Sequence, residues 1–437
     1  MSVHPHGQAL PPAASPVTHG ARGRWRGRHV LVAVVAVAVV AGVAGVFIGR
    51  ATEAGHEAGP SLSWQPLPQP PIAGRSGAAA VWTGKEMIVW GGYGRSGNAG
   101  QAADGAAYDP AMRAWRAIAP APAGVQGGAG AGVAWTGDAM VVWASNSPDG
   151  PVGAAVYDPV SDTWRRLPAG PLGRRELYSS VWTGTELLVI GGALGDTQAT
   201  PVAAALNPQS GTWRLVPAFD DLVFFGGPNG AVWDGREVFV AGALSLCPER
   251  GSACAERRSI LVAYDPAADT VREIALPAPS SAFGADTAAS LKPIGWTGTD
   301  VVFTAAGNRA AQLIRYNPTI GGWKGRTAAG CHIVDNPTQG HGCRDWRKGP
   351  PAPCYEAQTA WLGDRYVASC GEFGLQIFSL ATNAWALRTL TQGPSPLSSR
   401  GGSAIVWTGT DLIVWSGMVG KPGNPTPADG ASLTLPE

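Results

Sequence analysis

The chain has 437 residues, of which 45% are hydrophobic and only 14% charged, with 61 glycines, 37 prolines and 18 tryptophans. Glycine and proline together stay below the share of about 25–30% that is typical of low-complexity chains, and the many tryptophans need a core to bury them. A chain that is disordered throughout is therefore not expected. A proline about every twelve residues also excludes a mainly helical fold.

The net charge of +1 hides an asymmetry along the chain. Residues 1–50 contain five arginines and no Asp or Glu, so residues 51–437 carry 27 basic and 31 acidic residues. A body that binds nucleic acid would present a basic face. The mildly acidic body therefore argues against nucleic acid as a partner.

Residues 30–49 form a run of twenty residues without a charge or a proline. At about 1.5 Å per residue, a helix of this length spans the roughly 30 Å hydrocarbon core of a bilayer. Four arginines precede the run, and positive flanks stay on the cytoplasmic side. The run predicts a signal anchor in the cell membrane, with a cytoplasmic N-terminus and the rest of the chain outside.

A cleaved signal peptide is the alternative, and it would make the protein secreted. The apolar region of such a peptide is usually about 7–15 residues long, shorter than the run here. The predicted organisation is a disordered cytoplasmic tail (1–29), a transmembrane helix (30–49), a linker (50–61) and one globular domain (62–437).

A phrase Trp-Thr-Gly, followed by an apolar run, recurs along the globular domain. Clear copies are Trp82-Thr83-Gly84, ahead of MIVWGG, and Trp182-Thr183-Gly184, ahead of LLVIGG. Six copies continue with a second phrase, Tyr-Asp-Pro or a variant, and with Trp or Val seven residues after its first position. The first-phrase tryptophans, spaced 46 to 65 residues apart, are Trp82, Trp135, Trp182, Trp233, Trp296, Trp361 and Trp407.

Each copy is expected to fold as four short antiparallel strands. The Thr-Gly step makes a tight hairpin, and the continuous apolar run after it is typical of a strand covered on both faces. Four-stranded units at this period predict an all-β fold, a β-propeller with seven blades. The repeat tryptophans are expected to pack within and between the blades, and the acids after the hairpins, such as Glu86 and Glu186, to be turn or solvated residues.

The two ends of the domain are expected to share one blade. The last copy stops after its third strand, Gly430 to Leu435, and lacks a fourth. Residues 64–67 match the fourth strand at 164–167, and Trp64 precedes Trp82 by the same interval that separates Trp164 from Trp182. The N-terminal strand should therefore complete the last blade, which removes the open edge.

The repeats resemble kelch repeats, the propeller type also found in the catalytic domain of galactose oxidase. The resemblance is carried by the doublets Gly91-Gly92 and Gly191-Gly192, by Tyr-Asp-Pro and by the Trp seven residues after its Tyr, and it covers residues 62–437. It implies a fold and no particular activity. Three repeats depart from it, with Ala144-Ser145, Ala305-Ala306 and Cys370-Gly371 in place of the doublet.

The resemblance does not extend to the copper site of galactose oxidase, in which two histidines and two tyrosines hold the metal and one Tyr directly precedes a His. This chain has no Tyr-His pair, and its only histidines after His56 are His332 and His341, within one insertion. No metal and no cofactor are therefore expected.

All six cysteines follow the apolar run, as in an exported, oxidised domain. Cys354 and Cys370 lie almost symmetrically about the hairpin at Trp361 and are expected to form a disulfide. Elimination then pairs Cys247 with Cys254 and Cys331 with Cys343.

A zinc site formed by Cys331, His332, His341 and Cys343 is the competing hypothesis, since zinc prefers these ligand types. Export of the domain favours the disulfides.

The long loops of the repeats share one face of the propeller, which we call the long-loop face; the tight hairpins share the other, the short-loop face. Arg75, Arg175 and Arg400 each lie seven residues before a repeat Trp, where an inner strand begins at the channel mouth. Converging arginines could bind a carboxylate or an acidic sugar. Alternatively, each arginine only bonds loop carbonyls. Tyr178, Phe224, Phe225 and Trp346 also lie in these loops and could form a recognition patch.

Two functions follow from these patterns. The first is a membrane-anchored extracytoplasmic module whose long-loop face binds a protein or a cell-surface glycan. The second is an enzyme acting on a small anionic substrate at the channel mouth, with a structural role in the envelope as a third alternative. The acids considered for the enzyme are Glu176, Asp286, Glu356 and Glu372.

Overall fold

In the part of the chain described by the computed structural model, the regular secondary structure consists of short β-strands and one 3-10 helix. The chain divides into two units, Met1–Glu57 and Ala58–Glu437, and every described residue belongs to the second. The predicted tail, transmembrane helix and linker lie outside the described residues. Within the described ranges, no helix has the length and apolar character needed to cross a membrane. These ranges are 62–94, 101–127, 131–145, 152–194, 197–198, 202–222, 224, 228–245, 257–277, 291–306, 311–327, 333–334, 342–343, 359–369, 375–382, 384–388, 400–419 and 426–435.

Six sheets are four-stranded antiparallel meanders, and we number the sheets in chain order from the Trp82 repeat. The first sheet comprises β2 (Ala79–Trp82), β3 (Met87–Trp90), β4 (Gly105–Asp109) and β5 (Ala114–Ala117); the second comprises β6 (Gly132–Trp135), β7 (Met140–Ala144), β8 (Gly153–Asp158) and β9 (Thr163–Leu167). The fourth comprises β15 (Gly230–Trp233), β16 (Val238–Ser245), β17 (Arg257–Asp265) and β18 (Thr270–Glu273); the fifth comprises β19 (Lys292–Trp296), β20 (Val301–Ala306), β21 (Ala311–Asn317) and β22 (Gly322–Thr327). The sixth comprises β25 (Thr359–Trp361), β26 (Arg365–Ser369), β27 (Leu375–Ser379) and β28 (Ala384–Arg388); the last comprises β30 (Ala404–Trp407), β31 (Asp411–Trp415), β33 (Gly430–Thr434) and β1 (Gln65–Pro66).

The third sheet differs from the others because it has five strands. The prediction of seven blades is therefore wrong in its number: six four-stranded blades are found. The chain after the second strand of the third repeat folds back, and Ala193 pairs with Gln198 and Leu194 with Thr197. The strands of this sheet are β10 (Glu176–Trp182), β11 (Leu187–Leu194), β12 (Thr197–Gln198), β13 (Ala203–Asn207) and β14 (Thr212–Leu215), and η1 (Pro217–Phe219) follows them. Two further pairs lie outside these sheets: β23 (Ile333–Val334) with β24 (Gly342–Cys343), and β29 (Arg400–Gly401) with β32 (Met418–Val419).

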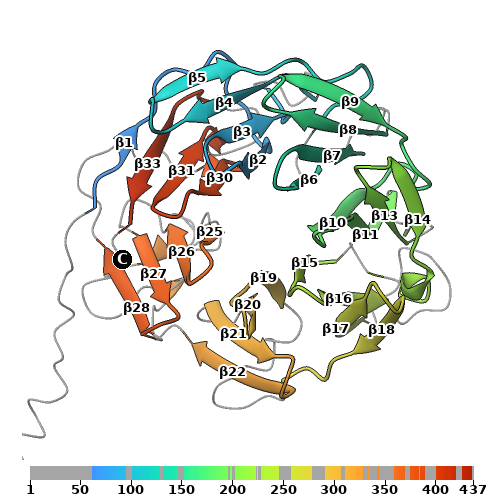
Figure 1. The fold of residues 1–437 in the computed structure, drawn as a ribbon. Helices are drawn as coiled ribbons and strands as arrows, with labels where there is room; N and C mark the ends of the chain where they lie inside the picture. Colours follow the sequence, from blue (N-terminus) through green and yellow to red (C-terminus); the bar gives the residue numbers. More distant parts are fainter. Residues whose placement is uncertain are drawn as a thin grey trace, which may run out of the picture. The chain divides into compact units, whose positions relative to one another are not determined.

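The sheets form a closed ring, with the first strand of each sheet innermost (Figure 1). The fold is therefore an all-β propeller, as the repeats predict. The N-terminal strand completes the last sheet, since Gln65 pairs with Ser432 and Pro66 with Ala431. This pairing confirms the predicted closure by both ends of the domain and covers the edge of β33.

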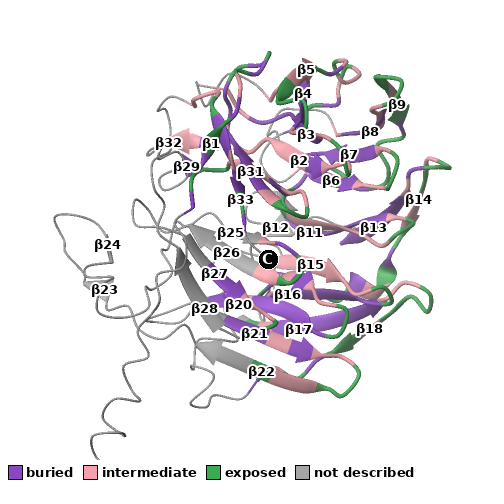
Figure 2. Ribbon diagram, turned by 60° about the vertical axis from the view of Figure 1, so that its left-hand side comes forward, coloured by how far each residue is buried: buried purple, intermediate pink, exposed green. Residues whose placement is uncertain are grey.

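The second strands of the first five sheets and of the last sheet are almost wholly buried, which explains their continuous apolar sequences. Every residue of β3 and β7 is buried, whereas the outer strands β5 and β9 are largely exposed (Figure 2). At the hairpin before β3, Gly84 has φ +91° and open space around it, so the turn needs glycine for its backbone conformation and not for room.

Each junction between neighbouring sheets holds one hydrophobic cluster in the described part of the chain. Every first-phrase Trp packs against one of these clusters, which confirms its predicted packing role. Trp82 contacts the cluster shared with the last sheet, and Trp407 contacts the cluster shared with the sixth. At Gly295 a Cβ atom would lie 2.1 Å from the Trp361 ring of the sixth sheet, so this junction requires glycine.

In four of the sheets, the tryptophan of the fourth strand ties the sheet to the chain that leaves the preceding one. The Trp164 indole N–H donates to the Ala119 carbonyl at 2.7 Å, and that of Trp213 to the Pro168 carbonyl at 2.9 Å. Trp115 and Trp323 make the equivalent bonds to Pro68 and Ala275. The tryptophan of the second phrase therefore has a specific role: its indole N–H binds a carbonyl of the connection that leaves the preceding sheet.

The fourth sheet has Val271 in place of this tryptophan, and the preceding sheet compensates for it. In the second sheet the Tyr157 and Trp164 ring centroids lie 5.0 Å apart. In the fourth sheet Tyr264 instead lies 5.1 Å from the ring of Phe219, which is fully buried in η1. An aromatic ring thus fills this place in both junctions, supplied by β9 in one and by η1 in the other.

Substituting Trp164→Phe should lower the free energy of unfolding by about 1–3 kcal/mol, since the Ala119 carbonyl loses its donor and part of the ring contact is lost. Thermal denaturation of the full-length chain measures this effect. Val271→Trp is the matched test of compensation: because Phe219 already fills the site, the added ring should destabilise and not stabilise the protein.

Candidate functional site

Arg75 lies under the long-loop face in an ion pair with an aspartate of its own sheet. Its Nη1 and Nη2 atoms donate to Asp104 Oδ1 at 2.7 Å and Oδ2 at 3.2 Å. Nε donates to the Ala73 carbonyl at 3.0 Å, and Nη1 also donates to the Gly91 carbonyl at 3.2 Å. These bonds hold the loop before β4 against the connection from the last sheet.

Arg400 repeats this arrangement in the last sheet, where Nη1 and Nη2 donate to Asp429 Oδ1 at 2.7 Å and Oδ2 at 3.0 Å. Asp104 and Asp429 both directly precede the third strand of their sheets. Each guanidinium is turned toward the aspartate of its own sheet. The contacts therefore favour the alternative in which the arginines organise loops over the one in which they converge on a ligand.

Arg175 in the third sheet is fully buried, and Val202 stands where the other two sheets have an aspartate. Its Nη1 donates to the Gly191 carbonyl at 2.9 Å and to the Val202 carbonyl at 3.4 Å. Burial lowers the pKa of Arg175 to about 10. This arginine therefore belongs to the interior of the propeller.

Two buried serines that the sequence interpretation missed connect these arginines to the preceding sheet. Ser416 Oγ accepts from the Arg75 N–H at 2.8 Å, and Ser145 Oγ accepts from the Arg175 N–H at 2.8 Å. Both serines stand where the first repeat has Gly91-Gly92. The sequence already shows Ala144-Ser145 in place of the doublet, but Ser416-Gly417 was not recognised there as a departure.

The ion pairs at the channel mouth expose their acids and bury their bases. The side chains of Arg75 and Arg400 are 6% and 8% exposed, whereas those of Asp104 and Asp429 are 52% and 47% exposed. The hydrogen bonds from Arg75 hold the pKa of Asp104 below its usual range, so this carboxylate stays ionised in mild acid. Where these pairs reach the surface, they present negative charge to solvent.

Tyr178 and Phe224, two of the aromatic candidates, are engaged inside the propeller. The Tyr178 hydroxyl accepts from the Gly132 N–H at 3.1 Å, and its ring packs edge-on against Trp143 with centroids 4.8 Å apart. Burial raises the pKa of Tyr178. Phe224 is buried in the cluster between the third and fourth sheets. The other two candidates, Phe225 and Trp346, lie outside the described residues.

Most of the remaining candidates also fall outside the described ranges. Cys343 is the exception among the cysteines: its backbone in β24 pairs with that of Ile333. Glu176, at the start of β10, is exposed. The disulfide and zinc hypotheses and three of the acids stay predictions, since they involve Cys247, Cys254, Cys331, His332, His341, Cys354, Cys370, Asp286, Glu356 and Glu372, which the structure does not describe.

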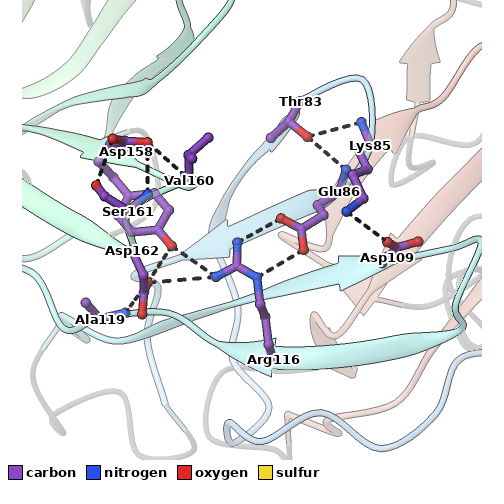
Figure 3. Close-up of polar contacts among 11 residues, drawn as sticks. Thr83, Lys85, Glu86, Asp109, Arg116, Ala119, Asp158, Val160, Ser161 and Asp162 are labelled. Atoms are coloured by element: carbon purple, nitrogen blue, oxygen red, sulfur yellow. Dashed lines mark hydrogen bonds and ion pairs between the residues drawn. The ribbon is translucent and has the colours of Figure 1, made fainter.

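On the short-loop face, a polar network joins neighbouring sheets (Figure 3). Arg116 donates from Nε to Glu86 Oε1 at 3.0 Å and from Nη2 to Glu86 Oε2 at 2.7 Å. Its Nη1 donates to the Tyr157 hydroxyl of the second sheet at 3.2 Å, and that hydroxyl donates to Asp162 Oδ1 at 2.6 Å. The network therefore crosses from one sheet to the next.

The same network recurs between the third and fourth sheets. Arg214 forms a two-pronged ion pair with Glu186 and donates to the Tyr264 hydroxyl at 3.2 Å, which donates to Asp269 at 2.9 Å. In the fourth sheet Arg272 pairs with Glu237. Glu86 and Glu186 do close their hairpin turns, as expected of turn or solvated residues. Each of the three glutamates also holds an arginine of the fourth strand of its own sheet, a role that the sequence did not predict.

The pKa shifts in this network follow from burial and from the ion pairs. Burial, reinforced by the bond to Asp162, raises the pKa of Tyr157 to about 12. The bonds from Glu86 raise the pKa of Arg116, and the bond from Tyr157 lowers that of Asp162. All of these groups therefore keep one protonation state near neutral pH, which suits a structural network and not a proton-transfer site.

No group of three or more His, Cys, Asp or Glu residues within the described ranges is arranged to hold a metal ion. The charged groups of both faces that the structure describes mainly bind one another. Comparison with known proteins adds no identity: no protein-family model matches the chain, and neither does any curated protein.

The Glu86–Arg116 pair should show a coupling free energy of about 1 kcal/mol in a double-mutant cycle of Glu86→Gln and Arg116→Gln, since it is partly buried and two-pronged. Unfolding by denaturant measures the coupling. The Arg258–Glu273 pair, with both side chains about half exposed, is the matched control and should couple by only a few tenths of a kcal/mol. Equal coupling in the two pairs would contradict the role given to the network.

The Arg75–Asp104 pair should make stability depend on pH in acid. Because the pKa of Asp104 is lowered on folding, its contribution is complete above the unfolded-state pKa, about 4, and is lost as the pH falls through the folded-state value. Asp104→Asn should therefore reduce stability at pH 7 by at most about 1 kcal/mol, because the acid is half exposed. The difference from the unsubstituted protein should shrink toward pH 2 in thermal denaturation; a constant difference would contradict this prediction.

Proposed function

We propose that this protein is an extracytoplasmic interaction module whose long-loop face binds a protein or a cell-surface glycan. The supporting observation is that the described arginines at the channel mouth, Arg75 and Arg400, bind aspartates of their own sheets. A β-propeller is often an interaction module, and on such a scaffold function usually lies in the loops. Recognition by surface complementarity needs no converging catalytic groups.

The ring is proposed to be of kelch type. The glycine doublets and the Trp seven residues after the Tyr of Tyr-Asp-Pro support this proposal. The indole bonds of Trp115, Trp164, Trp213 and Trp323 give the second motif a recurrent role. The relation to galactose oxidase extends to this repeat architecture and not to its chemistry.

The module is proposed to be attached to the cell membrane by residues 30–49, with its N-terminus in the cytoplasm. The length of the apolar run and the arginines ahead of it support this topology. A propeller exposed outside the cell agrees with the proposed disulfides of its six cysteines.

The enzyme alternative requires guanidinium donors that face a bound anion. Arg75 and Arg400 instead direct both terminal nitrogens at Asp104 and Asp429, and those acids are the exposed partners. An anionic substrate at either pair would meet a carboxylate first. The contacts therefore favour the interaction module.

Two matched triple variants test which face binds. The exposed alanines Ala73, Ala123 and Ala169 lie in connections on the long-loop face, and Ala111, Ala268 and Ala381 lie in turns of the short-loop face. The full-length chain in lipid nanodiscs is probed against a cell-surface glycan array and, by photo-crosslinking, against the surface proteins of intact cells. Replacing the three alanines of the long-loop face by Arg should reduce binding by about tenfold or more, since added bulk and charge disrupt surface complementarity. Replacing the three alanines of the short-loop face by Arg should leave binding unchanged.

Loss of binding only in the short-loop variant would contradict the proposed face. The absence of any bound glycan or protein in either assay would contradict the proposed function itself. Thermal denaturation of both variants shows whether the propeller stays folded.

A further inference from the structure

Leu177, near the start of β10 on the long-loop face, is an apolar residue in an unfavourable position. Its residue surface is 64% exposed, and its φ is +56°, in the left-handed region that L-residues with large side chains avoid. An exposed leucine gains nothing from the core, and its backbone is strained. Neither property helps the propeller to fold.

The other two arginine-bearing sheets show which residue this backbone position favours. Gly77 and Gly402 occupy the equivalent place, two residues after Arg75 and Arg400, with φ of +65° and +67°. The left-handed conformation is thus a requirement of the fold at this position, and glycine meets it without strain. Leu177 keeps the conformation and adds a side chain that points out of the ring's core.

The residues on either side of Leu177 hold it firmly. The Arg175 N–H donates to Ser145 Oγ, and Arg175 Nη1 donates to the Gly191 carbonyl. Tyr178 accepts from the Gly132 N–H of the second sheet and packs on Trp143. An exposed apolar side chain on a backbone fixed at both sides loses little freedom on binding, which is the property of an interface anchor.

The surroundings of Leu177 indicate the chemistry of a partner. Glu176 beside it is exposed, whereas Arg174 is only partly exposed, with its Nε buried, and Arg175 is fully buried. Residues 51–437 carry an excess of acidic residues, and Asp104 and Asp429 expose carboxylates on the same face. A complementary surface is an apolar pocket bordered by Lys or Arg.

We propose that Leu177 is the apolar anchor of a protein-binding site at the channel mouth, and that the partner is a protein with an apolar pocket bordered by basic side chains. This inference rests on the proposed function and narrows it from a protein or glycan to a protein. Glu176 would add attraction during association, which makes the association rate sensitive to salt.

A photo-crosslinking amino acid placed at position 177 of the full-length chain, displayed on intact cells, is the first step of the test. The same probe at Val160, an exposed apolar residue in a turn of the short-loop face, is the control. A protein crosslinked from position 177 and not from position 160 is expected. Its affinity is then measured, with the full-length chain in nanodiscs, for the unsubstituted protein, Leu177→Gly, Glu176→Gln and Val160→Gly.

Leu177→Gly should weaken binding by about tenfold or more while the melting temperature stays equal or rises, because glycine relieves the backbone strain. Glu176→Gln should slow association at low salt and have little effect at high salt. Val160→Gly should leave affinity unchanged. A folded Leu177→Gly protein that binds as well as the unsubstituted chain would overturn the inference, as would a fall in melting temperature that accounts for the lost binding.

These results separate the inference from the proposed function. If the long-loop triple variant loses binding and Leu177→Gly does not, the inference fails and the interaction module stands. If the ligand lost from the long-loop triple variant is a glycan, the inference likewise fails alone. If neither the long-loop triple variant nor Leu177→Gly changes the binding of any crosslinked protein or arrayed glycan, the inference and the proposed function both fail.

Discussion

The burial of apolar surface between neighbouring sheets is the interaction on which the rest of the structure depends. A four-stranded sheet has two apolar faces and can cover neither alone, so each sheet needs a neighbour on both sides. The described clusters satisfy this need at every junction, including the one between the last sheet and the first. A ring is the arrangement that leaves no face uncovered. It also explains why a strand as short as β1 matters: Trp64 and Leu67 on its flanks enter the clusters on the two sides of the last sheet.

Close packing at the junctions determines where polar groups stand. The indole N–H groups of Trp164 and Trp213 donate to carbonyls of the chain that leaves the preceding sheet. At the short-loop end of the junction, Arg116 spans from Glu86 to Tyr157 of the next sheet. At the long-loop end, buried serines take the backbone N–H groups of Arg75 and Arg175. Each polar contact thus completes a junction that apolar packing brings together.

The sequence was sufficient to predict those parts of the fold whose pattern lies within a single repeat. The hairpin at Gly84, the buried run of β3 and the closure by β1 all follow from patterns within one repeat or from the match between 64–67 and 164–167. The partners of the arginines did not follow. Asp104 stands 29 residues beyond Arg75, and Ser416 belongs to the other end of the chain, so only the folded ring shows that they meet. The fifth strand of the third sheet was missed for a similar reason, since β12 is a two-residue pairing of a turn in the chain without a periodic signal.

Departures from the repeat separate structural from functional residues. Val271 breaks the tryptophan pattern, but Phe219 places an aromatic ring against Tyr264 instead. The junction keeps its aromatic packing, so the fold itself explains this change. Ser145 and Ser416 break the glycine doublet, and each gains a bond to the following arginine. Leu177 stands where the other two repeats have Gly77 and Gly402. Its backbone is strained and its side chain is exposed, and neither property helps the propeller to fold. A residue that departs from its repeat at a cost to stability and without internal compensation is best explained by a contact with another molecule.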